Sequence, residues 1–232
     1  MRALVITHTE SEDPGAIGRW LPEVGLDLEV VAPWRGDPLP ASLDGYAALV
    51  VMGGPQQAYD DSSAAWLPAT KALIRKAVGD DLPMLGVCLG AQLLAEATGG
   101  RVAPCAAGPE LGARLVGKRD IAGSDPLCWD LPLSPLVIQW HFDEVVELPP
   151  GATLLMSSPA YPHQAFRVGD RAWGLQFHLE IDEPMVARWV ELDRADVADP
   201  PATLAAMVEA IPEIDEVWGE VIRRFGRLAL ET

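Results

Sequence analysis

Cysteine is scarce in this chain of 232 residues, which contains only Cys88, Cys105 and Cys128. The number is odd and no pair has C-x-x-C spacing, which argues against a disulfide framework and against a zinc site. Such sparse usage fits a reducing compartment, where a thiol stays usable. We therefore expect a cytoplasmic protein that holds no metal.

Positive charge is also in short supply. The chain has 17 Lys and Arg residues against 34 Asp and Glu, which gives a formal net charge of −17. A surface with this balance repels phosphate backbones, so we expect no nucleic-acid partner. The simplest explanation of the acidity is solubility.

Long apolar runs are missing as well. No stretch approaches the length of a membrane span, and the apolar run within residues 1–7 is too short for a signal peptide. We therefore expect no membrane association. With 49% hydrophobic and 22% charged residues, the composition suits one well-cored domain with a small appendage.

The most informative stretch is G-V-C-L-G at residues 86–90. An apolar run precedes it and a helix-like run over residues 91–97 follows it. Strand, sharp turn and helix form the pattern of the G-x-S-x-G nucleophile elbow, with Cys88 in place of serine. Glycine permits the close backbone approach that such a turn needs. A thiol at the start of a helix is favoured as thiolate, which makes Cys88 a candidate nucleophile.

The patterning of the first half predicts an α/β fold. Apolar runs at residues 4–6, 28–31 and 47–52 alternate with amphipathic segments, one of them a helix over residues 62–78. This alternation is typical of a doubly wound, mostly parallel sheet, whose sites lie beyond the carboxyl ends of the strands. The Gly53-Gly54 turn and Cys88 both follow such ends, so we expect them to face one crevice.

The second half has a different texture. Short β-like pieces between residues 101 and 179 predict a β-rich half that covers the sheet edge, ending in a strand over residues 171–180. Strand alternation would place Gln176, His178 and Glu180 on one face. Three helical segments are then expected, starting at Pro184, around residues 204–211, and over 214–228. We expect a domain over residues 1–182 and a helical extension over 183–232 packed on it.

A cysteine nucleophile needs a base, and the base needs a group that orients it. Of the four histidines, His178 is followed two residues later by a carboxylate on the same predicted strand face, Glu180. Attack on a carbonyl also needs an oxyanion hole, for which the N–H of Leu89 and the Gly53-Gly54 turn are candidates. His141 is open to either a structural or a functional role, and Cys105 and Cys128 are expected to be bystanders.

Three of these motifs together resemble class I (triad-type) glutamine amidotransferases: G-V-C-L-G-A-Q at 86–92, G-G-P at 53–55 and Q-F-H-L-E at 176–180. Their order and rough spacing match across about residues 1–182. The segments P-E-L-G (109–112), Q-W-H-F-D (139–143) and Q-A-F-R-V-G-D (164–170) resemble the free-standing, GMP-synthase-like branch. The resemblance implies a flavodoxin-like sheet and a Cys88–His178–Glu180 triad.

The resemblance also implies the chemistry. Cys88 would attack the γ-carboxamide of glutamine or another γ-glutamyl amide, a thioester would form, ammonia or an amine would leave, and water would release glutamate. Gly54 and Leu89 would supply oxyanion N–H groups. Gln92 matches a substrate-contacting residue, and the backbone from Trp140 to Phe142 matches the segment that holds the amino-acid end. No cofactor is implied.

Two positions depart from the family pattern. Phe142 stands where glycine is common, which narrows the pocket or adds an apolar wall, and Leu179 stands where proline is common. We expect no attached synthetase domain. Either a separate synthetase or acceptor enzyme receives the ammonia, or the enzyme is a stand-alone γ-glutamyl peptidase or hydrolase, which Phe142 mildly favours.

Two further alternatives come from other classes. A catalytically inactive binding protein is opposed by the intact triad. Another α/β family with a cysteine elbow is opposed by the late Q-F-H-x-E strand, which is not its pattern.

Overall fold

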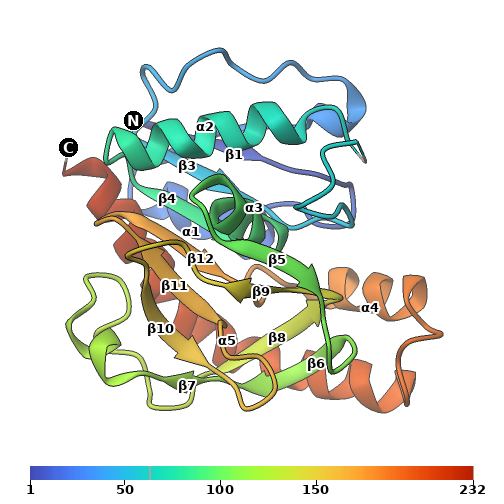
Figure 1. Ribbon diagram of the computed structural model, residues 1–232. Coiled ribbons are helices and arrows are strands. Elements are labelled where there is room, and N and C mark those ends of the chain that lie inside the picture. The colour runs from blue at the N-terminus through green and yellow to red at the C-terminus, as the bar shows by residue number, and fades with distance from the viewer. Residues whose placement is uncertain (63, 232) are drawn as a thin grey trace.

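The computed structural model describes residues 1–62 and 64–231. Its centre is an eight-stranded sheet with the strand order β2-β1-β3-β4-β12-β11-β10-β7 (Figure 1). The strands of this sheet are β1 (Arg2–Ile6), β2 (Asp27–Val31), β3 (Ala48–Val51), β4 (Met84–Val87), β7 (Gly117–Lys118), β10 (Thr153–Ser157), β11 (Ala165–Val168) and β12 (Ala172–Leu175). The first five strands in this order, from β2 to β12, are parallel, and the pairs from β12 to β7 are antiparallel. The prediction of a mostly parallel α/β sheet is confirmed.

Helices cover both faces of the parallel strands. They are α1 (Gly15–Glu23), α2 (Leu67–Gly79), α3 (Leu89–Ala97), α4 (Glu183–Leu192) and α5 (Pro200–Leu230), with the short 3₁₀ turns η1 (Pro33–Arg35) and η2 (Asp120–Ser124). Ala3 and Val5 of β1 pack in one core with α1, α4 and α5, whereas Leu4 and Ile6 pack in a second core with α2 and α3. Alternate residues of a strand point to opposite faces, so an unbroken apolar strand is what a doubly wound sheet requires.

The β-rich half is part of the central sheet rather than a cover for its edge. β12 pairs in parallel with β4, the strand that leads to Cys88, and β11, β10 and β7 continue the sheet outward. Two separate antiparallel ladders complete this half, β5 (Arg101–Pro104) with β9 (Asp143–Glu147) and β6 (Glu110–Leu115) with β8 (Leu136–His141). β5 and β9 contact α3, whereas β6 and β8 contact α5; Figure 1 shows both ladders away from α2.

Two helix predictions need correction. The helix expected over residues 62–78 begins at Leu67. Pro68 lies in its first turn, where backbone N–H groups have no partner within the helix, so proline, which has no N–H, costs no hydrogen bond there. Ser63 lies outside the described residues. The three predicted tail segments are two helices, because α5 continues through Pro212. Ile214, Trp218 and Phe225 of α5 are fully buried, and this packing outweighs the local cost of the proline.

In the described part of the chain, no helix is both long and apolar enough to cross a membrane. The boundary between a domain over residues 1–182 and an extension over 183–232 stays a prediction, since α4 and α5 share their core with α1 and the sheet; Thr232 lies outside the described residues.

Candidate active site

Cys88 lies at a strained turn between β4 and α3. Its φ of 50° and ψ of −106° are unusual for a residue with a side chain. A Cβ atom on Gly86 would lie 2.5 Å from the carbonyl group of Gly90, and a Cβ on Gly90 would overlap the carbonyl oxygen of Val51. The two glycines therefore let α3 pack directly against β3 and β4, which is what holds the turn in this conformation.

His178 and Glu180 lie just beyond the end of β12. The strand predicted over residues 171–180 stops at Leu175, so that prediction is wrong in length. His178 instead forms an isolated bridge with Ile138 of β8, with its N–H donating to the Ile138 carbonyl at 2.7 Å. The chain bends at Gln176 and Phe177 and then pairs with β8 in place of β11, and the side chains of His178 and Glu180 still meet.

The histidine and the carboxylate form a closed pair. Nδ1 of His178 lies 2.8 Å from Oε1 of Glu180, and the N–H of Leu179 donates to Oε2 at 3.0 Å. Both side chains are buried, and the indole of Trp189 packs 4.6 Å from the imidazole centroid. Since Nδ1 is taken by Glu180, the ring nitrogen left for Cys88 is Nε2.

Charge coupling ties Cys88 to this pair. Burial raises the pKa of the Cys88 thiol, opposed by the charge of His178 and a hydrogen bond with it. Burial alone would lower the pKa of His178, but Glu180 and Cys88 outweigh it and raise that pKa well above its usual value. Burial thus offsets the thiolate preference expected from the helix start, and the imidazole is the favoured acceptor when the thiol loses its proton.

Amide and carbonyl groups surround the sulfur. Sγ of Cys88 lies 3.9 Å from the carbonyl oxygen of Trp140, and Nε2 of Gln176 donates to Sγ over 3.8 Å. Nε2 of Gln92 donates to the carbonyl of Asp143 at 3.0 Å and to Oε1 of Gln176 at 3.3 Å. Gln92 thereby links α3 to the start of β9 beside Cys88.

A cavity of about 360 Å³ opens over the cysteine. Four of the residues predicted to act here besides Cys88 line it: Gly54, Gln92, Trp140 and Phe142. Leu89 does not line the cavity, but its side chain lies close to Gly54. A Cβ atom added to Gly54 would be 3.1 Å from Cδ2 of Leu89. The crevice expected between the Gly53-Gly54 turn and Cys88 is therefore present.

Phe142 occupies the rim of this cavity. Its side chain is 42% exposed, while its carbonyl accepts a hydrogen bond from the N–H of Cys105 at 2.9 Å. The neighbouring Trp140 is buried and donates from Nε1 to Oδ2 of Asp193 at 2.7 Å. The backbone of this segment is therefore fixed on both sides, and the benzyl group extends the cavity wall instead of blocking it.

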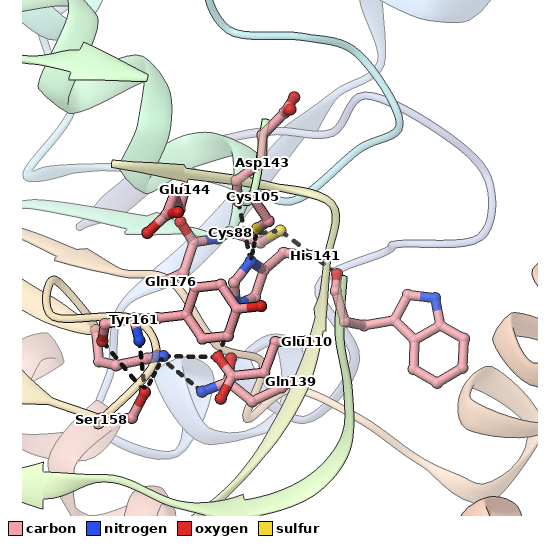
Figure 2. A network of polar contacts seen from close by, with 12 residues as sticks. Cys88, Cys105, Glu110, Gln139, His141, Asp143, Glu144, Ser158, Tyr161 and Gln176 are labelled. Atoms are coloured by element: carbon pink, nitrogen blue, oxygen red, sulfur yellow. Dashed lines mark hydrogen bonds and ion pairs between the residues drawn. The ribbon is translucent and has the colours of Figure 1, made fainter. Parts of the chain in front are cut away.

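His141, which lines the cavity, belongs to a polar network (Figure 2). Its Nδ1 lies 2.9 Å from the carbonyl of Asp143 and its Nε2 lies 3.0 Å from Oε2 of Glu110. Nε2 of Gln164 donates to the same Glu110 oxygen at 2.7 Å, and Oε1 of Gln164 accepts from Gln139 at 2.7 Å. Both ring nitrogens of His141 are thus engaged, while the residue also lines the cavity, so its role stays open between structure and function.

This network brings together residues from three separate segments of the sequence. Residues 109–112, 139–143 and 164–170 are far apart in the chain, yet Glu110, His141, Gln139 and Gln164 meet in one buried cluster. The segments that resemble one branch of the family are therefore joined by hydrogen bonds to His141, a residue of the cavity lining. No group of three or more His, Cys, Asp or Glu side chains in the described residues is placed to hold a metal ion.

Several cavity residues escaped the sequence reasoning, and Glu12 is one of them. Glu12 follows β1 and lines the cavity with Cys88. Its position after the carboxyl end of a parallel strand is a signal that could have identified it, because sites of doubly wound sheets gather at those ends. Asp193 and Asp196, which follow α4, also line the cavity and carry no comparable signal.

The model of the class I glutamine amidotransferase family matches residues 16–184. The chain belongs to this family. The glutamine amidotransferase-like protein YfeJ of Salmonella typhimurium is 30% identical over 208 residues, which cover 86% of this chain and 84% of that protein. A solved glutamine amidotransferase of Thermotoga maritima superimposes with a TM-score of 0.87 at 29% identity, covering 100% of this chain and 99% of the other.

Relatives in the amidotransferase family include enzymes of two kinds. A GMP synthase of Porphyromonas gingivalis is 32% identical over 185 residues, which cover 78% of this chain and 33% of that enzyme. Gamma-glutamyl peptidase 4 of Arabidopsis thaliana is 31% identical over 146 residues, which cover 62% of this chain and 57% of that protein. The chain thus spans about a third of the synthase, and the fold and family are common to all of these proteins.

Proposed function

We propose that the chain is a cysteine amidohydrolase that cleaves the γ-amide of glutamine or of another γ-glutamyl compound. The observation that carries this proposal is a set of three coupled groups: a cysteine that lines the cavity at a strained elbow, a buried imidazole coupled to it, and a buried carboxylate 2.8 Å from that imidazole. The arrangement matches the nucleophile, base and orienting group of acyl-transfer enzymes.

Acylation begins with proton transfer from Cys88 to Nε2 of His178, which Glu180 favours by stabilising the imidazolium. The sulfur adds to the γ-carbonyl carbon, and the carbonyl oxygen becomes an oxyanion. When the C–N bond breaks, His178 returns the proton to the leaving nitrogen, and ammonia or an amine departs. The γ-glutamyl group is then held as a thioester on Cys88.

Deacylation reverses these roles. His178 takes a proton from a water molecule, whose oxygen adds to the thioester carbonyl, and the proton passes to the sulfur as glutamate leaves. The N–H groups of Leu89 and Gly54 are the proposed oxyanion donors, because Leu89 directly follows Cys88 at the start of α3 and Gly54 lines the same cavity as Cys88. No cofactor enters this chemistry.

Substrate placement falls to the other cavity residues. We assign Gln92 and the backbone from Trp140 to Phe142 to the amino-acid end of the substrate, because these groups line the cavity next to Cys88 and are held by hydrogen bonds. The Phe142 side chain at the rim would contact whatever substituent the amide nitrogen carries.

A stand-alone γ-glutamyl peptidase or hydrolase is the second candidate. The exposed rim position of Phe142 favours it, since ammonia needs no apolar wall. In the first candidate a separate synthetase or acceptor enzyme receives ammonia, as the synthase relative suggests, and the protein acts in the cytoplasm. A catalytically inactive binding protein would have no use for the coupled triad.

Mass spectrometry of the intact protein tests the proposal. The protein is mixed with glutamine and with substituted γ-glutamyl amides, then quenched in acid, and we expect a mass increase of one γ-glutamyl group on Cys88. Cys88→Ala should abolish the adduct, whereas Cys128→Ser, at a buried cysteine outside the cavity, should keep it. A folded protein that forms no adduct with any γ-glutamyl amide would contradict the proposal.

A further inference from the structure

The active-site cavity carries an excess of negative charge. Four carboxylates line it, and no lysine or arginine lies among the described residues of its lining: Glu12, Asp143, Asp193 and Asp196. A γ-glutamyl group is a zwitterion, so its ammonium and carboxylate together leave this excess uncompensated. A cation elsewhere in the substrate would offset it.

Among these four carboxylates, Glu12 is the one with a buried oxygen that lacks a hydrogen-bond donor. Although the residue as a whole is partly exposed, its Oε2 is buried and has no hydrogen-bond partner. Burial raises the pKa of Glu12 to about 7, with Glu180 and Asp193 adding to the rise and the charge of His178 opposing it. A buried carboxyl group without a donor is costly, and a ligand that supplies N–H donors removes the cost.

A second orphaned atom in the lining has the same character. Oε1 of Gln56 is buried and unpartnered, while its Nε2 donates to the carbonyl of His8 at 3.1 Å. Both unsatisfied atoms of the lining, on Glu12 and Gln56, are therefore acceptors. An ammonium group, with three donors and no acceptor, complements such a surface better than a hydroxyl or a carboxylate does.

The position of Glu12 identifies which end of the substrate it faces. A Cβ atom on Gly53 would overlap Oε2 of Glu12 and lie 3.0 Å from Cε1 of His178, so the carboxyl group and the imidazole flank the same glycine. His178 is the group that protonates the leaving nitrogen in the proposed function. Glu12 therefore lies on the leaving-amine side of Cys88.

The loop that carries Glu12 is fixed in this position. Nε1 of Trp189 donates to the carbonyl of Ser11 at 3.0 Å, and the same indole packs against His178. The N–H of Gly15 donates to Asp13 at 2.8 Å on the other side of Glu12. The backbone on both sides of Glu12 is thus tied by hydrogen bonds.

We propose that the enzyme is selective for γ-glutamyl amides whose leaving amine bears a second, positively charged nitrogen, as in γ-glutamyl diamines and polyamines, and that Glu12 binds this ammonium group. The inference rests on the proposed function and gives it a substrate class. Hydrolysis breaks the amide C–N bond as above, and the cationic amine leaves past Glu12 and over the rim.

Three substrates of matched chain length test this selectivity: the γ-L-glutamyl amides of 1,4-diaminobutane, n-pentylamine and 5-aminopentanoate, which end in an ammonium, a methyl and a carboxylate group. At pH 8 and low salt, we expect kcat/KM to be highest for the ammonium amide, by about tenfold or more over the methyl amide, and lowest for the carboxylate amide. The preference should weaken at high salt.

Glu12→Gln should lower the ammonium-to-methyl ratio of kcat/KM to near one. The ratio is taken within one variant, so a general loss of activity cancels. Glu10→Gln is the matched control, because Glu10 lies on the same loop, does not line the cavity and pairs only at the surface with Arg188. The control should keep the wild-type ratio.

The outcomes separate this inference from the proposed function. If the wild type acylates Cys88 but cleaves the ammonium and methyl amides equally, or if Glu12→Gln keeps the preference, the substrate class is wrong while the proposed function stands. If no γ-glutamyl amide acylates Cys88, both fail together.

Discussion

The imidazole of His178 and the carboxylate of Glu180 face each other across 2.8 Å although the strand that carries them ends at Leu175. Beyond the end of β12, two backbone hydrogen bonds between His178 and Ile138 hold this segment against β8. The pair is therefore positioned by β8, a strand from a different ladder. Substitutions in β8 and substitutions of His178 or Glu180 should therefore both alter the reactivity of Cys88.

Glu180→Gln should make Cys88 a weaker nucleophile. Without the carboxylate, the pKa of His178 falls, and the thiol has a poorer proton acceptor. We expect turnover to drop by about 10²–10⁴-fold and the pH at which iodoacetamide alkylates Cys88 at half its maximal rate to move upward. Measuring that alkylation rate from pH 5 to 10 in both proteins checks the direction, and an unchanged midpoint would contradict the coupling.

Gly90→Ala should destabilise the fold. The added Cβ would overlap the carbonyl oxygen of Val51, so α3 must move away from β3. We expect a loss of more than about 2 kcal/mol in the free energy of unfolding, measured by urea titration. Gly79→Ala in the last turn of α2 is the control, since a Cβ there meets no atom within 4 Å, and it should be neutral or slightly stabilising. Equal free energies of unfolding of the two variants would contradict the close packing of Gly90 against the carbonyl group of Val51.

Phe142→Ala should alter substrate preference with little effect on stability. The side chain is 42% exposed, so its removal should change the free energy of unfolding by less than about 1 kcal/mol. Loss of an apolar wall should reduce kcat/KM for γ-glutamyl n-pentylamide by about three- to tenfold relative to glutamine. Steady-state assays of both substrates decide this, and a ratio equal to that of the wild type would mean that the rim does not contact the leaving group.

Glu12→Gln should change how stability depends on pH. The pKa of Glu12 is raised from 4.5 to about 7, so the folded protein holds a proton that the unfolded chain has released in this window. The free energy of unfolding therefore falls as the pH rises from about 4.5 to 7 and stays low above it. The variant lacks this loss and should be more stable than the wild type at pH 8, by on the order of 2 kcal/mol.

Near pH 4 the advantage of Glu12→Gln should vanish, because the carboxyl group is then protonated in both states of the wild type. Denaturant titrations at pH 4 and pH 8 give the comparison, with Glu10→Gln as the exposed control from the same loop. A pH-independent difference between the wild type and Glu12→Gln would show that the buried carboxyl group titrates normally.

Much of the fold was predictable because its signals are local. The apolar run at residues 4–6 lies within β1, and the run at residues 47–52 contains β3. Alternate residues of β1 pack into the two hydrophobic cores on opposite faces of the sheet. The limits of the helices and of β12 were not predictable. Pro212 is a local helix breaker that burial of α5 overrides, and β12 stops because His178 pairs with a strand that the local sequence does not reveal.

The sequence by itself determined the reactive group and its partners by type: a cysteine between glycines, a histidine two residues before a glutamate, and a glycine turn after a strand. Each of these patterns lies within a few neighbouring residues, so it can be recognised without the tertiary structure. Only the tertiary structure decided that Glu12, Gln56 and Asp193 join Cys88 around one cavity, since they come from separate loops. Burial then gave Glu12 its raised pKa, because desolvation depends on what surrounds a side chain and not on its neighbours in sequence.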